Sequence, residues 1–231
     1  MQIKGFQKLT LLDYPGKLGA TIFTGGCNFR CGFCHNASLV LNPNLIPSID
    51  QNEVLETLKQ KKKVLQGICI TGGEPLLQKD LEEFIIALKE MGYLVKLDTN
   101  GSFPERLKLL IDNHLIDYVA MDVKNSLEKY HLSTGINNID TTAILKSINL
   151  IKENKIPYEF RTTTIKEHHT KEDFIAIGKL LKGAERLFLQ AYSDSPDVIK
   201  VGFHAHTKEE MIEFKEILSN YIKEVELRGI D

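Results

Sequence analysis

Short runs of apolar and β-branched residues alternate along the chain with longer stretches in which apolar positions recur every three to four residues. The short runs predict buried strands, and the longer stretches predict amphipathic helices that cover them. The expected strands occupy residues 20–23, 67–71, 94–99, 118–122, 158–164 and 186–190, with a further candidate at 225–227. This alternation is typical of βα units, in which helices join parallel strands.

Capping residues mark the starts of helices between these strands. The expected signals are a capping box of Ser48 and Gln51, then Asp80, Pro104, Asp140 or Thr141, Thr170, and a second capping box of Thr207 and Glu210. Six βα repeats result, which predict an α/β fold: a partial (β/α)6 TIM-like barrel with a parallel sheet and outer helices. Because no stretch reads as an interdomain linker, residues 1–231 are expected to form a single domain.

Composition narrows the range of partners. The chain of 231 residues has a formal net charge of −2 and a pI near 6.4. Nucleic acid and anionic lipid normally select a basic surface, so we expect neither, and a protein or small-molecule substrate is favoured. No apolar run reaches the roughly 20 residues that cross a bilayer, and the first residues lack the apolar region of a secretory signal. A cytoplasmic location is expected.

Three of the four cysteines lie in one short segment directly after the first expected strand. Cys27, Cys31 and Cys34 follow the spacing C-x3-C-x2-C, and three thiolates from one loop can hold a 4Fe-4S cluster while one iron keeps an open position. Such an iron can bind an amine and a carboxylate of a substrate. The alternatives are a zinc-binding interaction module, with His35 as a further ligand, or unreactive thiols. Cys69 lies inside a strand among bulky neighbours, which indicates a core residue.

The cysteine loop, with Phe33 just before its last cysteine, resembles the signature of the radical S-adenosylmethionine (SAM) superfamily. Between about residues 11 and 190, further segments narrow the likeness to the activating enzymes of glycyl radical enzymes. These segments are LLDYPGK, CHN, TGGEPLL, KLDTNG, AMDVK and YEFRTT. Among these, the chain is most similar to the activating protein of anaerobic ribonucleoside-triphosphate reductase, in the longer form similar to pyruvate formate-lyase activase.

The resemblance implies a radical SAM oxidoreductase with one 4Fe-4S cluster, because the chain has no cysteines for a second. The reduced cluster would cleave SAM to a 5'-deoxyadenosyl radical, which would remove a hydrogen from a glycine of a glycyl radical enzyme. A low-potential donor such as flavodoxin or ferredoxin would supply the electron. The alternative is a radical SAM enzyme that acts on a small molecule. Residues 41–47 and 192–206 are the candidate contacts of a partner peptide.

The remaining motifs follow successive strands, so a parallel barrel would bring them to one mouth. By resemblance, the loop of Gly72 and Gly73 accepts the amino group of SAM, while Glu74 is expected to satisfy backbone groups of that loop. Asp98 and Asn100 follow the third expected strand and are expected at the mouth, although an ordinary polar turn would look the same.

Further ligand-binding residues are expected on the later strands. Asp122 and Lys124 share one side of a strand, and in similar activases such a pair contacts the ribose and the carboxylate of SAM; a structural ion pair is the alternative. Arg161 is expected to point inward toward a carboxylate of ligand or protein. By resemblance, Phe33 packs near the adenine, and Asp98 with Asp122 could hold a monovalent cation. Gln190 stands near the place where similar activases carry a histidine.

Overall fold

The centre of the protein is one sheet of eight strands in chain order, as seen in a computed structural model that describes residues 1–154 and 156–230. Strands β2 to β8 run parallel, and β1 pairs antiparallel with β2. The strands are β1 (Ile3–Thr10), β2 (Gly19–Thr24), β3 (Gly67–Gly72), β4 (Leu94–Thr99), β5 (Tyr118–Asp122), β6 (Tyr158–Thr164), β7 (Arg186–Ala191) and β8 (Glu224–Arg228).

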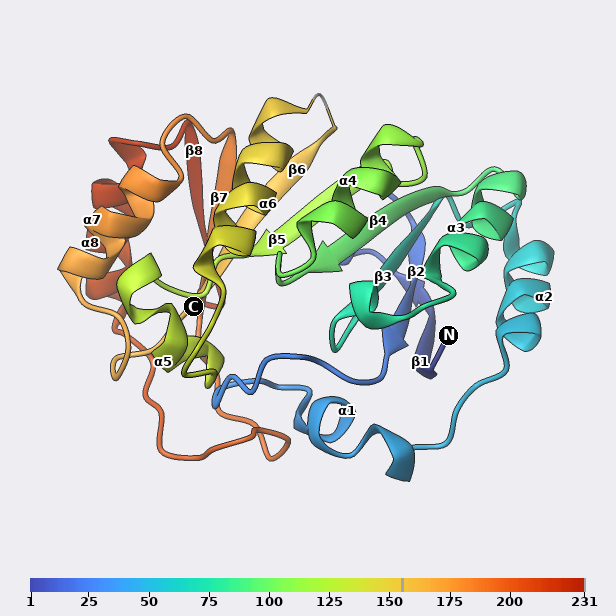
Figure 1. Ribbon diagram of the computed structural model, residues 1–231, viewed down its shortest axis with the longest axis horizontal. Helices are drawn as coiled ribbons and strands as arrows, with labels where there is room; N and C mark the ends of the chain where they lie inside the picture. The colour runs from blue at the N-terminus through green and yellow to red at the C-terminus, as the bar shows by residue number, and fades with distance from the viewer. Residues whose placement is uncertain (155, 231) are drawn as a thin grey trace.

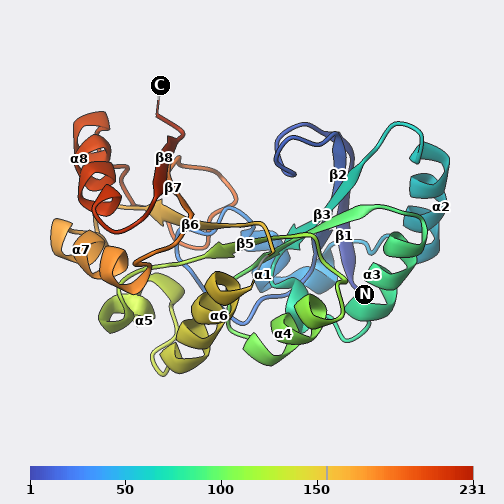
Figure 2. The same cartoon turned by 90° about the horizontal axis from the view of Figure 1, so that it is seen from above.

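The sheet curves, and the long helices lie on its outer, convex side (Figures 1 and 2). The helices are α1 (Ala37–Leu41), α2 (Gln51–Lys61), α3 (Leu81–Glu90), α4 (Pro104–Asp112), α5 (Tyr130–Thr134), α6 (Thr141–Glu153), α7 (Lys171–Leu180) and α8 (Lys208–Ser219), with 3-10 turns η1 (Pro43–Leu45), η2 (Pro75–Leu77) and η3 (Leu127–Lys129). Within the described part of the chain, no helix is long and apolar enough to cross a membrane.

Alternation along the strands separates an apolar outer face from a polar inner face. On β4, Val95 and Leu97 are fully buried in the hydrophobic core beneath the helices. Lys96 and Asp98 point to the opposite, concave face, where they form an ion pair. Because strand side chains alternate with a period of two, each βα unit contributes to the core with one face and to the interior of the barrel with the other.

The expected α/β partial barrel is confirmed, and the sheet is wider than predicted. Residues 94–99, 118–122 and 158–164 form strands with the expected limits, and the candidate at 225–227 is part of β8. Among the strands, the prediction missed β1, whose sequence IKGFQKLT mixes lysines, a glycine and partly exposed positions. It is an edge strand that pairs with one neighbour only, and edge strands carry a weak apolar signal.

The helix start signals were mostly right, with two corrections. The capping box of Ser48 and Gln51 is absent, because the Asp50 carboxylate accepts the first amide hydrogens of α2 and the Ser48 hydroxyl accepts from the amine of Lys4. Asp80 does occupy the position before α3, but its carboxylate binds the amino terminus and Gln51 instead of capping the helix. The capping box at the start of α8 is confirmed.

Candidate active site

A cavity of about 260 Å³ opens at the carboxyl ends of the strands, where the loops gather at the lower side of Figure 1. It brings together segments that are far apart in the sequence. Twelve of the thirteen predicted site residues line it: Cys27, Cys31, Phe33, Cys34, Gly72, Gly73, Asp98, Asn100, Asp122, Lys124, Arg161 and Gln190. The thirteenth, Glu74, is fully buried behind the lining.

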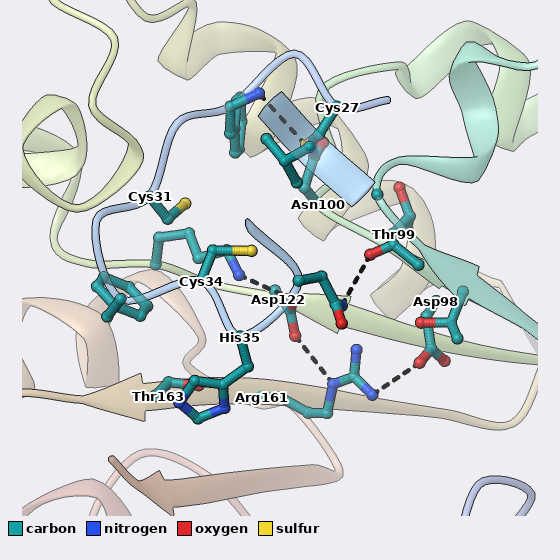
Figure 3. A pocket seen from close by; sticks show the side chains of 18 of the residues that line it. Cys27, Cys31, Cys34, His35, Asp98, Thr99, Asn100, Asp122, Arg161 and Thr163 are labelled. Carbon is teal, nitrogen blue, oxygen red and sulfur yellow. Dashed lines mark hydrogen bonds and ion pairs between the residues drawn. The ribbon is translucent and has the colours of Figure 1, made fainter. Parts of the chain in front are cut away.

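The cysteine loop connects β2 to α1 and presents its thiols to this cavity (Figure 3). The Sγ of Cys27 accepts a hydrogen bond from the backbone N–H of Phe29 at 3.3 Å. Burial raises the pKa of Cys27 to about 11 and that of Cys31 to about 12, while the nearby Lys124 acts in the opposite direction. A cysteine binds metal as its thiolate. The bound iron would therefore have to displace the thiol protons, which is the direction in which Lys124 already acts.

The donor set fits a cluster held by three thiolates. All three side chains come from one loop and face one cavity that also contains carboxylates and cations. Among residues 1–154 and 156–230, no three His, Cys, Asp or Glu side chains converge as a site for one metal ion requires. The ring of His35, the further ligand in the zinc alternative, lies 5.6 Å from the ring of Tyr192, measured between centroids.

The paired glycines after β3 are required by close packing against the cysteine loop. Gly72 has a φ of +111°, and a Cβ there would lie 2.4 Å from the backbone nitrogen of Thr24. A Cβ on Gly73 would lie 1.9 Å from the carbonyl oxygen of Gly26. The backbone N–H of Gly73 donates to the carbonyl of Thr24 at 2.9 Å. The two loops therefore hold each other, which a larger residue at either glycine would prevent.

Glu74 connects this loop to the end of β4. Its carboxylate accepts hydrogen bonds from the backbone N–H groups of Leu76 (3.1 Å) and Asn100 (2.7 Å) and from the hydroxyl of Thr99 (2.9 Å). Burial raises the pKa of Glu74 to about 7. The contacts agree with the expectation that Glu74 satisfies loop groups from behind the cavity.

Five charged side chains form an alternating series across the inner face, which we call the charge ladder: Lys96, Asp98, Arg161, Asp122 and Lys124. The guanidinium of Arg161 lies between the two carboxylates, 3.0 Å from Asp98 and 2.9 Å from Asp122 (Figure 3). The ammonium of Lys124 is 2.9 Å from Asp122. Burial alone would raise the pKa of both carboxyls, yet the adjacent cations lower it.

The ladder shows which way the side chain of Arg161 points and what lies between Asp98 and Asp122. Arg161 points inward, and its partners are carboxylates of the protein. The same guanidinium stands between Asp98 and Asp122, the pair considered for a monovalent cation. Lys96 was not predicted as a site residue, although alternation along KLDTNG places it on the same face as Asp98. Cys69 is buried as expected, but it faces this polar side, with its Sγ 3.8 Å from the amine of Lys96.

An aromatic group borders the cysteine loop. The ring of Phe33 meets those of His168 and Phe203 edge-on, each at 6.2 Å between centroids. Phe203 belongs to the long connection after β7, residues 192–206, and the N–H of Lys200 in the same connection donates to the carbonyl of Gly32 at 2.8 Å. The connection therefore packs against the cysteine loop.

The end of β7 and the connection that follows it differ in where their polar side chains lie. Gln190 lines the cavity at the carboxyl end of this strand. His204 lies on the exposed surface and pairs with Glu167.

Similarity to known proteins agrees with this geometry. The family model of the radical SAM superfamily matches residues 21–181. The chain belongs to the radical SAM superfamily. A protein of Methanocaldococcus jannaschii, provisionally named a glycyl-radical enzyme activating enzyme, is 34% identical over 99% of this chain and 96% of its own length. The pyruvate formate-lyase-activating enzyme of Staphylococcus aureus is 28% identical over 78% of this chain and 75% of its own length. The narrower resemblance to glycyl radical activating enzymes is therefore confirmed.

Solved structures show the same fold at low sequence identity. Streptococcus suis SuiB bound to its precursor peptide SuiA superposes with a TM-score of 0.70, at 16% identity, over 89% of this radical SAM chain and 48% of SuiB. TYW1 with a lysine-pyruvate adduct gives a TM-score of 0.61, at 16% identity, over 87% of this chain and 72% of TYW1. This chain spans about half the length of SuiB. Membership of the superfamily implies a 4Fe-4S cluster and SAM as the cofactors of this radical SAM chain.

Proposed function

We propose that this protein is a glycyl radical activating enzyme that cleaves SAM reductively and removes one hydrogen atom from a glycine of a partner enzyme. The observation that carries the proposal is the convergence of three loop thiols and the charge ladder on a single cavity. The similarity to a protein of that name over 99% of the chain supports the same conclusion. We propose that residues 1–231 act as one radical SAM domain.

The three cysteines would hold the cluster, and the surrounding residues would hold SAM. Cys27, Cys31 and Cys34 would leave one iron open for the amine and carboxylate of the ligand. When bound and reduced, the cluster supplies the electron that breaks the carbon–sulfur bond of SAM, yielding methionine and a 5'-deoxyadenosyl radical.

Each other side chain would bind or orient the ligand. The loop of Gly72 and Gly73 lines the cavity and would accept the amine, while Glu74 keeps that loop in place through its three hydrogen bonds. Asp122 and Lys124, one acceptor and one donor on a single side of the cavity, suit the ribose hydroxyls and the carboxylate.

The remaining proposed contacts complete the cavity wall. Phe33 would pack against the adenine, and Gln190 can donate or accept a hydrogen bond at the place where similar activases carry a histidine. Asn100, whose amide lies 2.9 Å from the Asn28 side chain, would keep the cysteine loop in position. Arg161 already supplies positive charge between Asp98 and Asp122, so the proposal does not require a monovalent cation.

The reaction needs exclusion of water and of stray hydrogen donors more than it needs acid or base catalysis. The radical would take the α-hydrogen of the glycine, leaving 5'-deoxyadenosine and a glycyl radical on the partner. The electron would come from flavodoxin or ferredoxin in the cytoplasm. We propose anaerobic ribonucleoside-triphosphate reductase as the partner, on the similarity of the LLDYPGK, CHN and YEFRTT segments.

Electron paramagnetic resonance of the anaerobically reconstituted, reduced protein tests the proposal in two steps. Addition of SAM should change the signal of the cluster, because SAM would bind at the iron that the three cysteines leave open. Addition of the reductase should then produce a doublet signal from a glycyl radical. A reductase in which the radical-bearing glycine is replaced by alanine is the control and should give no doublet.

The outcomes separate the alternatives. A cluster that responds to SAM without a radical on any encoded glycyl radical enzyme would exclude activation and favour a small-molecule substrate. A radical on pyruvate formate-lyase, but not on the reductase, would keep the activase and change its target. Purified protein without bound iron would overturn the proposal.

A further inference from the structure

Lys96 is a buried cation to which the proposed function gives no task. Its side chain is only 3% exposed, near the middle of the inner face of the sheet. Lysine is almost never buried to this extent unless it is paired. Its partner is Asp98, and its Nζ also lies 3.8 Å from the Sγ of Cys69. The amine is therefore held inside the barrel at one end of the charge ladder.

Each carboxylate oxygen of the charge ladder is paired with a cation of the ladder. The two oxygens of Asp98 face Lys96 and Arg161, and the two oxygens of Asp122 face Arg161 and Lys124. Three cations and two carboxylates leave one surplus positive charge. Without Lys96, the other four charges would cancel.

The neighbouring carboxylates have direct partners outside the ladder. Glu159, on the same inner face, lies 3.6 Å from Arg228 and accepts a hydrogen bond from Tyr118 at 3.1 Å. Glu74 accepts its hydrogen bonds from two backbone amides and one hydroxyl, none of which belongs to the ladder. The surplus is therefore available to an anion at the cavity, where Lys124 and Arg161 are part of the lining.

We propose that Lys96 is a positioning residue for SAM: its ammonium group keeps Asp98 directed toward Arg161 and gives the charge ladder the surplus positive charge that receives the carboxylate of the ligand. Lys96 acts through Asp98 and Arg161 and does not touch SAM itself. The inference rests on the proposed function, because it concerns how that site binds its cofactor. The ammonium group of Lys96 thereby supplies, beside Asp98, the positive charge that a bound monovalent cation would otherwise supply.

The test replaces Lys96 with methionine, which keeps most of the volume and removes the charge. Calorimetric titration of the cluster-containing Lys96→Met protein with SAM should give a dissociation constant about tenfold to a hundredfold higher than that of the wild type, as expected for loss of a charged interaction. Potassium or ammonium ions should restore part of the affinity, because they can enter the space that the amine leaves. Tetramethylammonium at equal ionic strength should not, because it is too large.

Two further variants control the charge argument. The double variant Lys96→Met with Asp98→Asn removes one charge of each sign, so its ladder keeps the surplus, and its SAM binding should be independent of potassium. Lys63→Met removes an exposed lysine near the end of α2 and should leave the dissociation constant unchanged. Circular dichroism establishes that each variant is folded. If the single variant does not fold, Lys96→Gln, which removes the charge and keeps a polar side chain, takes its place in the same titrations.

The results distinguish this inference from the proposed function. If the wild type does not bind SAM, the proposed function fails. Wild-type binding together with an unchanged constant for Lys96→Met would overturn the role of Lys96 alone. A folded Lys96→Met protein whose weakened binding ignores potassium and ammonium would also overturn it, because the loss would then be structural. Potassium dependence of the double variant would contradict the charge count.

Discussion

At the scale of single residues, the four cysteines divide according to where their side chains point. Cys34 faces the cavity with the other two loop cysteines, whereas Cys69 is enclosed between Lys96 and Asp98 on the inner face of β3. We expect Cys34→Ala to lose most of its bound iron and Cys69→Ala to retain it. Iron and sulfide analysis after anaerobic reconstitution checks this. Equal iron loss in both variants would show that Cys69 has a part in holding the cluster.

The glycine loop gives a steric prediction. A methyl group on Gly73 would overlap the carbonyl oxygen of Gly26, so Gly73→Ala must push the cysteine loop away. We expect destabilisation of about 1–3 kcal/mol and poor retention of iron. Gly183→Ala is the matched control: its φ of +81° also disfavours alanine, but nothing lies within 4 Å of the added carbon. Full iron retention by Gly73→Ala would contradict the account of loop packing.

His169 makes stability depend on pH. The ring is buried, with one nitrogen 3.0 Å from the carbonyl of Lys124 and the other 3.2 Å from the backbone nitrogen of Ile165. Burial lowers the pKa of His169 to about 4. Because the unfolded chain binds this proton more readily, the contribution of His169 to the free energy of unfolding should fall as pH falls from about 6.5 toward 4, by about 2 kcal/mol between pH 7 and pH 5. Glu74, whose pKa is raised, acts in the opposite direction over the same interval.

Urea unfolding of the protein without its cluster measures this effect and avoids the acid lability of iron and sulfide. Relative to His169→Gln, the wild type should lose about 2 kcal/mol of unfolding free energy between pH 7 and pH 5, because Glu74 is the same in both proteins. His204→Gln, which changes an exposed histidine, should follow the wild type. An unchanged slope in His169→Gln would mean that other groups cause the acid sensitivity.

The sequence located cavity-lining residues where a motif coincides with the end of a strand, and it missed a charged residue that lies inside a strand. Asp98, Asp122 and Arg161 were placed correctly because alternation and a known motif agree. Lys96 follows the same alternation, yet a lysine in a strand normally predicts a side chain exposed to solvent. Its burial depends on Asp98 and on the curvature of the sheet around it, which no local pattern encodes.

At the scale of elements, residues 192–206 act as a support for the cysteine loop. The carboxylate of Asp197 accepts hydrogen bonds from the backbone N–H of Ser38 at 3.1 Å and from its hydroxyl at 2.6 Å. We expect Asp197→Ala to release iron to a chelator severalfold faster, since each lost hydrogen bond is worth about 1 kcal/mol. Asp194→Ala is the control, because Asp194 contacts Tyr192 and Ser195 within the same segment. Equal release rates in the two variants would exclude this support.

Whether a strand or helix was found from the sequence depended on how much of that segment is buried in the core. The parallel strands β4, β5 and β6 were located to the residue because they are central strands, whose β-branched and apolar positions pack into the core. The edge strand β1 and the short helices α1 and α5 were missed, because segments of this kind owe their conformation to contacts with distant parts of the chain. The packing of residues 192–206 on the cysteine loop could not be predicted from the local sequence pattern either, because it joins segments that are far apart in the chain.

At the scale of the whole molecule, the partial barrel explains how one chain can carry this chemistry. The outer face supplies the apolar core, and the inner face supplies charge, so the site can be polar without weakening the fold. The sheet is open, because β1 and β8 are not paired with each other. A barrel left open in this way can admit an extended segment of a partner, which a closed barrel filled by its own side chains could not.

The most direct test of the central claim follows the hydrogen atom. The reductase is prepared with glycine deuterated at the α-carbon, activated anaerobically with this protein and SAM, and the 5'-deoxyadenosine is analysed by mass spectrometry. The account predicts one deuterium atom in 5'-deoxyadenosine for each glycyl radical formed. Unlabelled 5'-deoxyadenosine, produced while SAM is consumed, would show that the hydrogen comes from elsewhere and would contradict the assignment as an activating enzyme of this reductase.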